Sequence, residues 1–279
     1  MTVHTIELDG MTLTRVGYLD VPVPAELLGL TPEKVSAISW ASPLWADDDQ
    51  PRLGAAAWFL DIGHRRIVYD PLFALDVLLR ADPEAEQTHE TAVASAFIEA
   101  GFAPDSVDLV IASHIEDVGM IARRWESTGW MPFFPQAQVM LSEPELTAFE
   151  SGALAPESGT NPTREAWQML IDEDRVSSFQ HGEKLAPGLH ADVSGGHSPG
   201  HTVLHIGADP AKPSASLIGH LAVTAVHLAT GECEALNEDP VAVWSILQAT
   251  IADGRRLIGP LWPSPGHGSW EAGALRVEN

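Results

Sequence analysis

The sequence predicts a single layered α/β domain, and three observations support this prediction. Apolar runs of strand length recur in both halves of the chain, and segments with helical spacing separate many of them. Strands that alternate with helices pack as sheets covered by helices. The 279 residues show no low-complexity segment and no clear linker, and with 45% hydrophobic residues they can bury a sizeable core. One domain over residues 1–279 is therefore expected.

The first hundred residues predict three strands and a helix. Apolar and polar residues alternate up to about residue 20, which is typical of a half-buried strand. Residues 21–53 are rich in Pro, Asp and Trp, and we expect them to form an N-terminal extension loop over the surface. Residues 53–60 and 66–69 have the apolar character of two further strands. Helical spacing predicts a helix over residues 88–100.

The remaining chain continues this alternation. Strands are expected at residues 107–112, 138–141, 190–194, 202–207, 215–219 and 255–259, and helices at residues 118–125, 164–171 and 240–252. Ser142 and Glu145 have the spacing of a capping box, in which each side chain accepts a hydrogen bond from the backbone N–H of the other residue. A further helix is therefore expected to begin directly after Ser142.

The charge of the chain excludes several classes of partner. It has 15 basic and 39 acidic residues, a net charge of −24, so it repels phosphate backbones and anionic membrane surfaces. No apolar stretch approaches the roughly 20 residues that cross a bilayer, and the N-terminus shows no secretory signal. Cys233 is the single cysteine, so neither an intramolecular disulfide nor a multi-cysteine zinc site is possible. We expect a cytoplasmic protein that binds neither nucleic acid nor membranes.

A glycine-rich run with two histidines, residues 194–202, has the strongest chemical signal. Glycines beside His197 and His201 allow an imidazole to point away from a tight turn with little steric obstruction. Histidine is the commonest side-chain metal ligand. The run by itself is also compatible with a tight loop that satisfies both histidines internally.

The run Gly-His-Ser-Pro-Gly-His-Thr at residues 196–202 resembles the GH-[ST]-PGHT signature of the metallo-β-lactamase superfamily. Further segments resemble the branch that contains N-acyl homoserine lactonases and methyl parathion hydrolases. In chain order they are FLD at 59–61, IVYDP at 67–71, VDLVIASH at 107–114, FPQAQV at 134–139, SEPEL at 142–146 and GPLWPSPGHG at 259–268. The resemblance spans about residues 54–270 and implies a four-layer αββα sandwich.

The same resemblance implies a metal site that has been rewritten. The family's H-x-H-x-D-H motif is two residues shorter here, so that His114 keeps the first position while Glu116 and Asp117 stand where Asp-His is usual. His197 keeps the later single-histidine position. His220 replaces the bridging aspartate, which removes one negative charge.

The closing motif has also changed. The position of the family's last ligand histidine aligns with Leu261, and His267 lies six residues further along. Of the seven ligands that are usual in the family, two survive unchanged.

Three hypotheses remain open for this site. In the first, His114, His197 and His220, with Asp117 or Glu116, hold one divalent ion. These donors suit zinc and iron alike. The resemblance then implies hydrolysis of an ester, lactone or related bond, with Glu116 or Asp117 orienting water or accepting its proton.

The second hypothesis is a metal-free descendant in which His114 and His220 perform acid–base chemistry of a lyase, isomerase or cyclase. The third keeps the fold as a platform for ligand binding. His201 is expected to stabilise its loop rather than bind a metal.

Four residues are candidates for contact with a small-molecule substrate. The resemblance places His227 where the branch has a polar pocket residue. Trp130, Phe133 and Trp262 lie in segments that surround the active site of this fold, and large aromatic rings can wall an apolar pocket. The segment 21–53 is a candidate contact for a homodimer.

Overall fold

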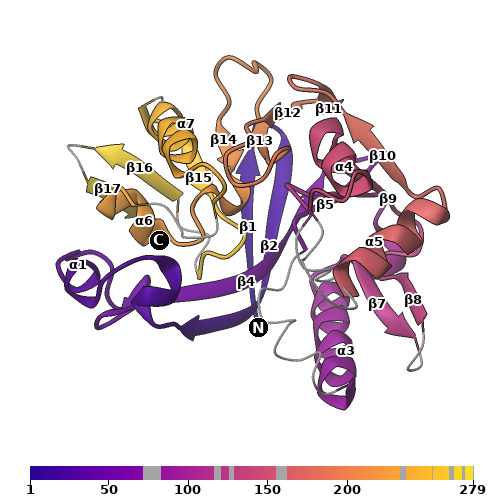
Figure 1. Cartoon of the computed structure of the whole chain (residues 1–279), viewed down its shortest axis with the longest axis horizontal. Coiled ribbons are helices and arrows are strands. Elements are labelled where there is room, and N and C mark those ends of the chain that lie inside the picture. Colours follow the sequence, from indigo (N-terminus) through magenta and orange to yellow (C-terminus); the bar gives the residue numbers. More distant parts are fainter. Residues whose placement is uncertain are drawn as a thin grey trace.

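The computed structural model describes residues 1–71, 83–115, 121–125, 129–154, 162–232, 237–252, 254–263, 267–271 and 274–278. Two large sheets pack against each other within these residues, and helices lie beside each of them (Figure 1). This is the predicted four-layer αββα sandwich. No helix in the described part of the chain is long and apolar enough to span a membrane.

The first sheet comes from the N-terminal half and has the strand order β1-β2-β4-β5-β6-β9-β10, with β3 paired to β4. Its strands are β1 (Thr2–Leu8), β2 (Met11–Pro22), β3 (Ala46–Asp47), β4 (Gln50–Asp61), β5 (Arg66–Tyr69), β6 (Leu109–Ile111), β9 (Gln138–Ser142) and β10 (Val176–Phe179). Strands β1 to β5 pair in antiparallel fashion, whereas β5, β6, β9 and β10 run parallel.

The second sheet comes from the C-terminal half and has the order β11-β12-β13-β14-β15-β16-β17. Its strands are β11 (Lys184–Ala186), β12 (Leu189–Val193), β13 (Thr202–Ile206), β14 (Ala215–Leu217), β15 (Arg256–Ile258), β16 (His267–Glu271) and β17 (Ala274–Glu278). Strands β14 and β15 are parallel, and the other pairs are antiparallel.

Helices lie beside both sheets and beside a separate hairpin. They are η1 (Ala25–Leu28), α1 (Pro32–Ser36), α3 (Pro83–Glu99), η2 (Pro104–Ser106), α4 (Glu143–Glu150), α5 (Pro162–Asp172), η3 (Gly219–Leu221), α6 (Ala225–Thr230) and α7 (Pro240–Ala252). Helices α3 and α4 contact the first sheet, and α6 and α7 contact the second (Figure 1). Helix α5 packs against the hairpin of β7 (Ala122–Trp125) and β8 (Gly129–Pro132).

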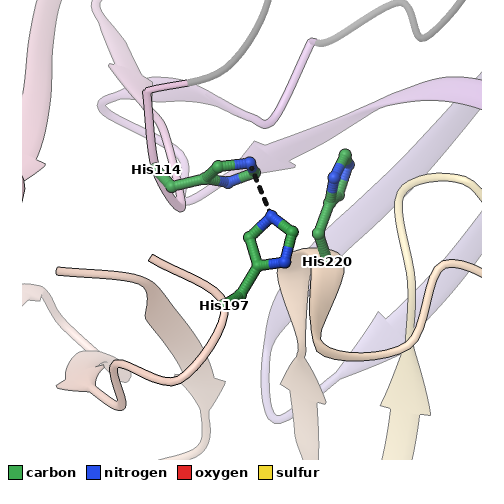
Figure 2. A group of neighbouring side chains, drawn as sticks. All are labelled: His114, His197 and His220. Carbon is green, nitrogen blue, oxygen red and sulfur yellow. Dashed lines mark hydrogen bonds between the residues drawn. The ribbon is translucent and has the colours of Figure 1, made fainter. Parts of the chain in front are cut away.

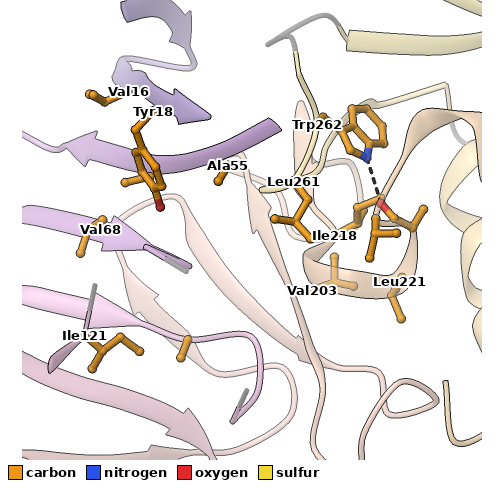
Figure 3. Close-up of a cluster of buried hydrophobic side chains, with 14 of the residues drawn as sticks. Val16, Tyr18, Ala55, Val68, Ile121, Val203, Ile218, Leu221, Leu261 and Trp262 are labelled. Carbon is orange, nitrogen blue, oxygen red and sulfur yellow. Dashed lines mark hydrogen bonds between the residues drawn. The ribbon is translucent and has the colours of Figure 1, made fainter. Parts of the chain in front are cut away.

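The strands are buried on both faces because alternate side chains enter different cores. Leu13, Trp58 and Ile67 of the first sheet meet Leu204 and Leu217 of the second in a core between the sheets. Successive residues of a strand point to opposite faces, so the intervening side chains pack outward. Figure 3 shows part of this second, outer cluster.

Residues up to about 20, expected to form one strand, form the antiparallel pair β1 and β2. Two further segments also differ from the sequence-based expectations. Residues 122–125 were expected to be helical, but Ala122–Trp125 forms strand β7, which pairs with β8 (Gly129–Pro132) in an antiparallel hairpin. The helix prediction is therefore wrong for these residues, because hairpin pairing outweighs local spacing. Residues 118–120 lie outside the described part.

The segment 21–53, expected to be a surface loop, contains η1, α1, β3 and the start of β4. It also buries Ala25, Val35 and Trp45 completely or nearly so in the outer core. Helix α1 packs beside α6. Its apolar residues therefore contribute to the domain core.

Candidate metal centre

His114 follows the parallel strand β6 and is held by hydrogen bonds to its neighbours. Its Nδ1 lies 2.8 Å from the Ser113 hydroxyl, and the backbone N–H of Ser113 donates to Asp70 Oδ1 at 2.6 Å. Asp70 is fully buried, and burial raises the pKa of its carboxyl while the nearby His114 and His220 oppose that rise. Asp70 directly follows β5, so its side chain connects the end of β5 to the residue that precedes His114.

His197 lies in the loop between β12 and β13. The backbone N–H groups of Ser194 and Gly195 both donate to the carbonyl of His201, which closes the loop. His197 Nδ1 lies 2.7 Å from Asn237 Oδ1. Because a carbonyl oxygen only accepts, Nδ1 carries the hydrogen, and the Nε2 lone pair of the neutral ring is directed away from Asn237.

His220 lies in η3, directly after β14. Its backbone N–H donates to His201 Nε2 at 3.1 Å. The preceding residue, Gly219, has φ +54, and a Cβ there would lie 2.4 Å from His201 Nε2 and 2.9 Å from Ser113 Cβ. Glycine is therefore required at this position. His201 thus supports the site, which confirms its expected loop-stabilising role.

The three predicted ligands converge, as Figure 2 shows. One nitrogen of each ring lies within 4.8 Å of the others, and the rings of His114, His197 and His220 are all buried. Nε2 of His114 and Nε2 of His197 are 3.2 Å apart, and the ring centroids of His114 and His220 are 4.8 Å apart. Residues separated by more than 100 positions therefore meet at one point.

This donor set fits a divalent ion. Two imidazole nitrogens bound tetrahedrally to zinc at about 2.0–2.1 Å are about 3.3–3.4 Å apart. The Nε2 atoms of His114 and His197, which are hydrogen-bonded to each other in Figure 2, lie 3.2 Å apart, close to that value. Both rings are also fixed through their other nitrogen, as is usual for histidines that bind metals.

Two predicted aromatic pocket residues pack within the protein. Phe133 is 4% exposed, and its ring meets those of Phe97 and Phe134. Trp130 is partly buried in β8, and its indole N–H donates to Glu165 of α5 at 3.4 Å. Any contact of these rings with a substrate remains a prediction.

The other two substrate candidates are also engaged internally. Trp262 is buried, meets Trp45 edge-on with ring centroids 5.3 Å apart, and donates its indole N–H to the Ala222 carbonyl (Figure 3). His227 is buried, and its Nε2 lies 2.8 Å from the Leu28 carbonyl of η1. Burial lowers the pKa of His227, so its ring is neutral near pH 7. Their proposed roles with a substrate remain predictions.

The acidic candidates Glu116 and Asp117 lie outside the described residues, as does the side chain of His267. Leu261, which aligns with a ligand histidine of the family, is 4% exposed and belongs to the outer apolar cluster (Figure 3). Strands β14 and β15 are parallel neighbours, with Leu217 opposite Ile258. Leu261 and His220 therefore follow the same edge of the sheet.

Sequence reasoning missed two partners of the site and assigned a third a different role. Asn237 precedes α7 and orients His197, but nothing in the local sequence indicates which residue it faces. The Ser113 hydroxyl was not singled out, although its place beside His114 was a usable signal. Glu145 was expected to cap α4, whereas its carboxylate accepts hydrogen bonds from the loops that carry His114 and His197.

Several solved structures resemble the whole chain at low sequence identity. No protein-family model matches the sequence, and no curated protein matches it. A hydrolase of the β-lactamase superfamily, AbOPH, aligns over 99% of this chain and 96% of its own, with a TM-score of 0.75 and 17% identity. The dizinc quorum-quenching lactonase AidC covers the same shares, with a TM-score of 0.66 and 12% identity.

A probable metal-dependent hydrolase from Staphylococcus aureus covers 92% of this chain and 91% of its own, with a TM-score of 0.65 and 14% identity. At these identities the likeness establishes the fold. The chain therefore has the metallo-β-lactamase fold and is structurally similar to hydrolases and lactonases of that superfamily.

Proposed function

We propose that the protein is a metal-dependent hydrolase that holds one divalent ion, zinc or iron, through His114, His197 and His220. The observation that carries this proposal is the convergence of three buried imidazole nitrogens within 4.8 Å of one another. Histidine is the commonest side-chain metal ligand. Three neutral rings that meet at one point can each direct a nitrogen lone pair at one divalent cation.

Two replacements support a single ion rather than the pair named for AidC. His220 is a neutral donor at the position where the family has a bridging aspartate, so one negative charge is missing. Leu261 is an apolar, buried side chain at the position of another ligand. With fewer donors and less negative charge, the site favours one divalent ion.

Residues of the chain orient the imidazole rings and accept the proton from water. Ser113 and Asn237 hold the rings of His114 and His197 in fixed orientations. We assign the acceptance of the proton from water to Asp117 or Glu116, which follow His114 directly in sequence. When bound, a divalent ion supplies Lewis acidity, which polarises the bond to be cleaved and acidifies water.

The proposed substrate is a small molecule with an ester, lactone or related acyl or phosphoryl bond. Similar structures include the lactonase AidC, whose structure contains the product N-hexanoyl homoserine, and the hydrolase AbOPH. A substrate panel should therefore contain N-acyl homoserine lactones, simple aryl esters and a phosphotriester.

The test combines metal analysis with hydrolysis of this panel. Protein purified without added metal should contain about one ion per chain by mass spectrometry. Exhaustive chelation should remove hydrolysis of the preferred substrate, and added zinc or ferrous iron should restore it. Full activity after complete removal of metal would contradict the proposal. It would favour metal-free acid–base chemistry by His114 and His220, in a site where His197 Nε2 lies 3.2 Å from His114 Nε2.

A further inference from the structure

The carboxylate of Glu145 connects two of the loops that carry the proposed ligands. Glu145 Oε1 accepts a hydrogen bond from the backbone N–H of Ile115 at 2.9 Å. Its Oε2 accepts from the Ser198 hydroxyl at 2.7 Å and from the backbone N–H of Gly200 at 2.8 Å. Ile115 directly follows His114, and Ser198 directly follows His197. One side chain thus contacts the immediate neighbours of both histidines.

Glu145 is buried, so replacing its carboxylate would leave buried hydrogen-bond donors without an acceptor. Its side chain has no exposure to solvent, and a buried carboxylate is tolerated only where it is well hydrogen-bonded or paired. Here neutral donors surround both oxygens, and the carboxylate lies in the first turn of α4, where the helix dipole favours negative charge. The capping-box prediction is confirmed for Ser142, whose hydroxyl accepts from the Glu145 N–H at 3.3 Å. The carboxylate of Glu145, in contrast, is directed at the two loops.

The loop of His197 is seated directly on the start of α4. The Ser142 hydroxyl donates to the Gly200 carbonyl at 2.5 Å. A Cβ added to Gly200 would lie 2.2 Å from the backbone nitrogen of Glu145 and 2.3 Å from the Ser142 hydroxyl oxygen. Only glycine allows so close an approach. This close contact fixes the His197 loop against α4. The Glu145 carboxylate then joins this loop to Ile115, which follows His114.

We propose that Glu145 is a positioning residue of the three-histidine site, which sets the separation of His114 and His197. This proposal rests on the proposed function, because it concerns the geometry that the ion requires. The carboxylate acts through the backbone of Ile115 and through Ser198 and Gly200, without touching either imidazole. A carboxylate is needed because both of its oxygens must accept hydrogen bonds. An amide offers only one accepting oxygen.

The substitution Glu145→Gln tests this requirement at nearly constant volume. Whichever way the new amide turns, its NH₂ group faces an N–H donor. Glu143→Gln is the matched control, because Glu143 is an exposed carboxylate in the first turn of the same helix. The measurements are zinc affinity by competition with a chelator, and the visible absorption spectrum of the cobalt-loaded protein.

We expect Glu145→Gln to weaken zinc binding about 10-fold or more, the lower range for residues that orient metal ligands, and to change the cobalt spectrum. Glu143→Gln should keep the affinity and spectrum of the wild type. Wild-type affinity and spectrum in Glu145→Gln would overturn the proposal. If Glu145→Gln does not fold, Ser198→Ala removes one donor and leaves the carboxylate. It should weaken zinc binding several-fold, and an unchanged affinity would overturn the proposal.

A wild-type protein that binds no ion would defeat the proposed function without deciding this inference. The ring nitrogen chemical shifts of His114 and His197, measured by NMR on ion-free protein, then provide the test. Altered shifts in Glu145→Gln, but not in Glu143→Gln, support the positioning role. Unchanged shifts in both variants overturn it.

Discussion

Two groups of side chains in this molecule both contain histidines but differ in geometry. The first is the candidate metal centre formed by His114, His197 and His220, where all three residues follow or connect strand ends and are buried. The second, the strand-face cluster, joins Asp192 to His181, His205 and Ser216. His205 of β13 lies opposite Ser216 of β14, and Asp192 lies on β12.

The strand-face cluster is built around a carboxylate. Asp192 Oδ1 lies 2.8 Å from His181 Nδ1, its Oδ2 lies 3.5 Å from His205 Nε2, and His205 Nδ1 lies 2.8 Å from the Ser216 hydroxyl. His181 is 71% and Asp192 44% exposed. Both nitrogens of His205 have partners on its own sheet. In the candidate metal centre, by contrast, rings from different loops direct nitrogens at one another.

The comparison indicates that convergence of ring nitrogens from separate loops distinguishes the candidate ligand set from an ordinary polar cluster. Side chains along adjacent strands stand side by side and pair with their neighbours. Side chains that follow strand ends can turn toward a common point. Within the described residues, the group of three donors close enough to hold an ion is the candidate metal centre, and the strand-face cluster does not form such a group.

The largest effect should come from removing a ring of the candidate metal centre, with removal of a ring of the strand-face cluster as the matched control. His197→Ala leaves two of the three imidazoles, and we expect the bound ion to fall from about one per chain to below about 0.1, with loss of hydrolysis. His205→Ala should keep the ion and the activity. Elemental analysis of both purified variants measures this. Equal ion contents in the two variants would contradict the proposal that His197 binds the ion and His205 does not.

A smaller effect should follow from removing the partner of one ring. Asn237→Leu deletes the oxygen that accepts from His197 Nδ1, so the ring can rotate or change tautomer. We expect zinc affinity to fall about 10- to 100-fold. Asn237→Asp keeps an accepting oxygen and should stay close to the wild type. Chelator competition measures both, and equal losses in the two variants would show that the oxygen does not orient the ring.

The smallest effect is expected in the strand-face cluster. The hydrogen bond from His205 is the main cause that lowers the pKa of Asp192, and His181 also lowers it. A lowered pKa means that the folded state favours the carboxylate, so its contribution is present above the ordinary pKa of about 3.9 and is lost as pH falls through the folded value.

Asp192→Asn should therefore reduce the free energy of unfolding by less than about 1 kcal/mol at pH 7, because exposed ion pairs contribute little. The difference from the wild type should disappear on acidification below the ordinary pKa of the carboxyl group. Urea unfolding at several pH values measures this, with Asp47→Asn in β3 as an exposed control. If Asp192→Asn lowers the free energy of unfolding as much at pH 3 as at pH 7, the ionised Asp192 carboxylate is not the source of the stabilisation.

Local pattern predicted about half of the strands and helices in the described residues. The apolar runs at 66–69 and 138–141 match β5 and β9, and the helix expected at 240–252 is α7. The pattern failed at residues 122–125, because their conformation depends on pairing with β8, which lies further along the chain. It also failed to predict that residues 21–53 contribute to the core, because the apolar partners of Val35 and Trp45 lie elsewhere in the sequence.

The sequence by itself predicted the layered fold through its periodicity, and the resemblance of its histidine motifs to a known family predicted three candidate ligands, because both signals are present in the order of the residues. Only the tertiary structure decided which side chains support those ligands. Asn237 reaches His197 across 40 positions, and Glu145 reaches Ile115 across 30. A hydrogen bond depends on distance in space, and residue order constrains that distance weakly once the chain has folded. The role of Glu145 therefore changed from a predicted helix cap to a contact between two loops.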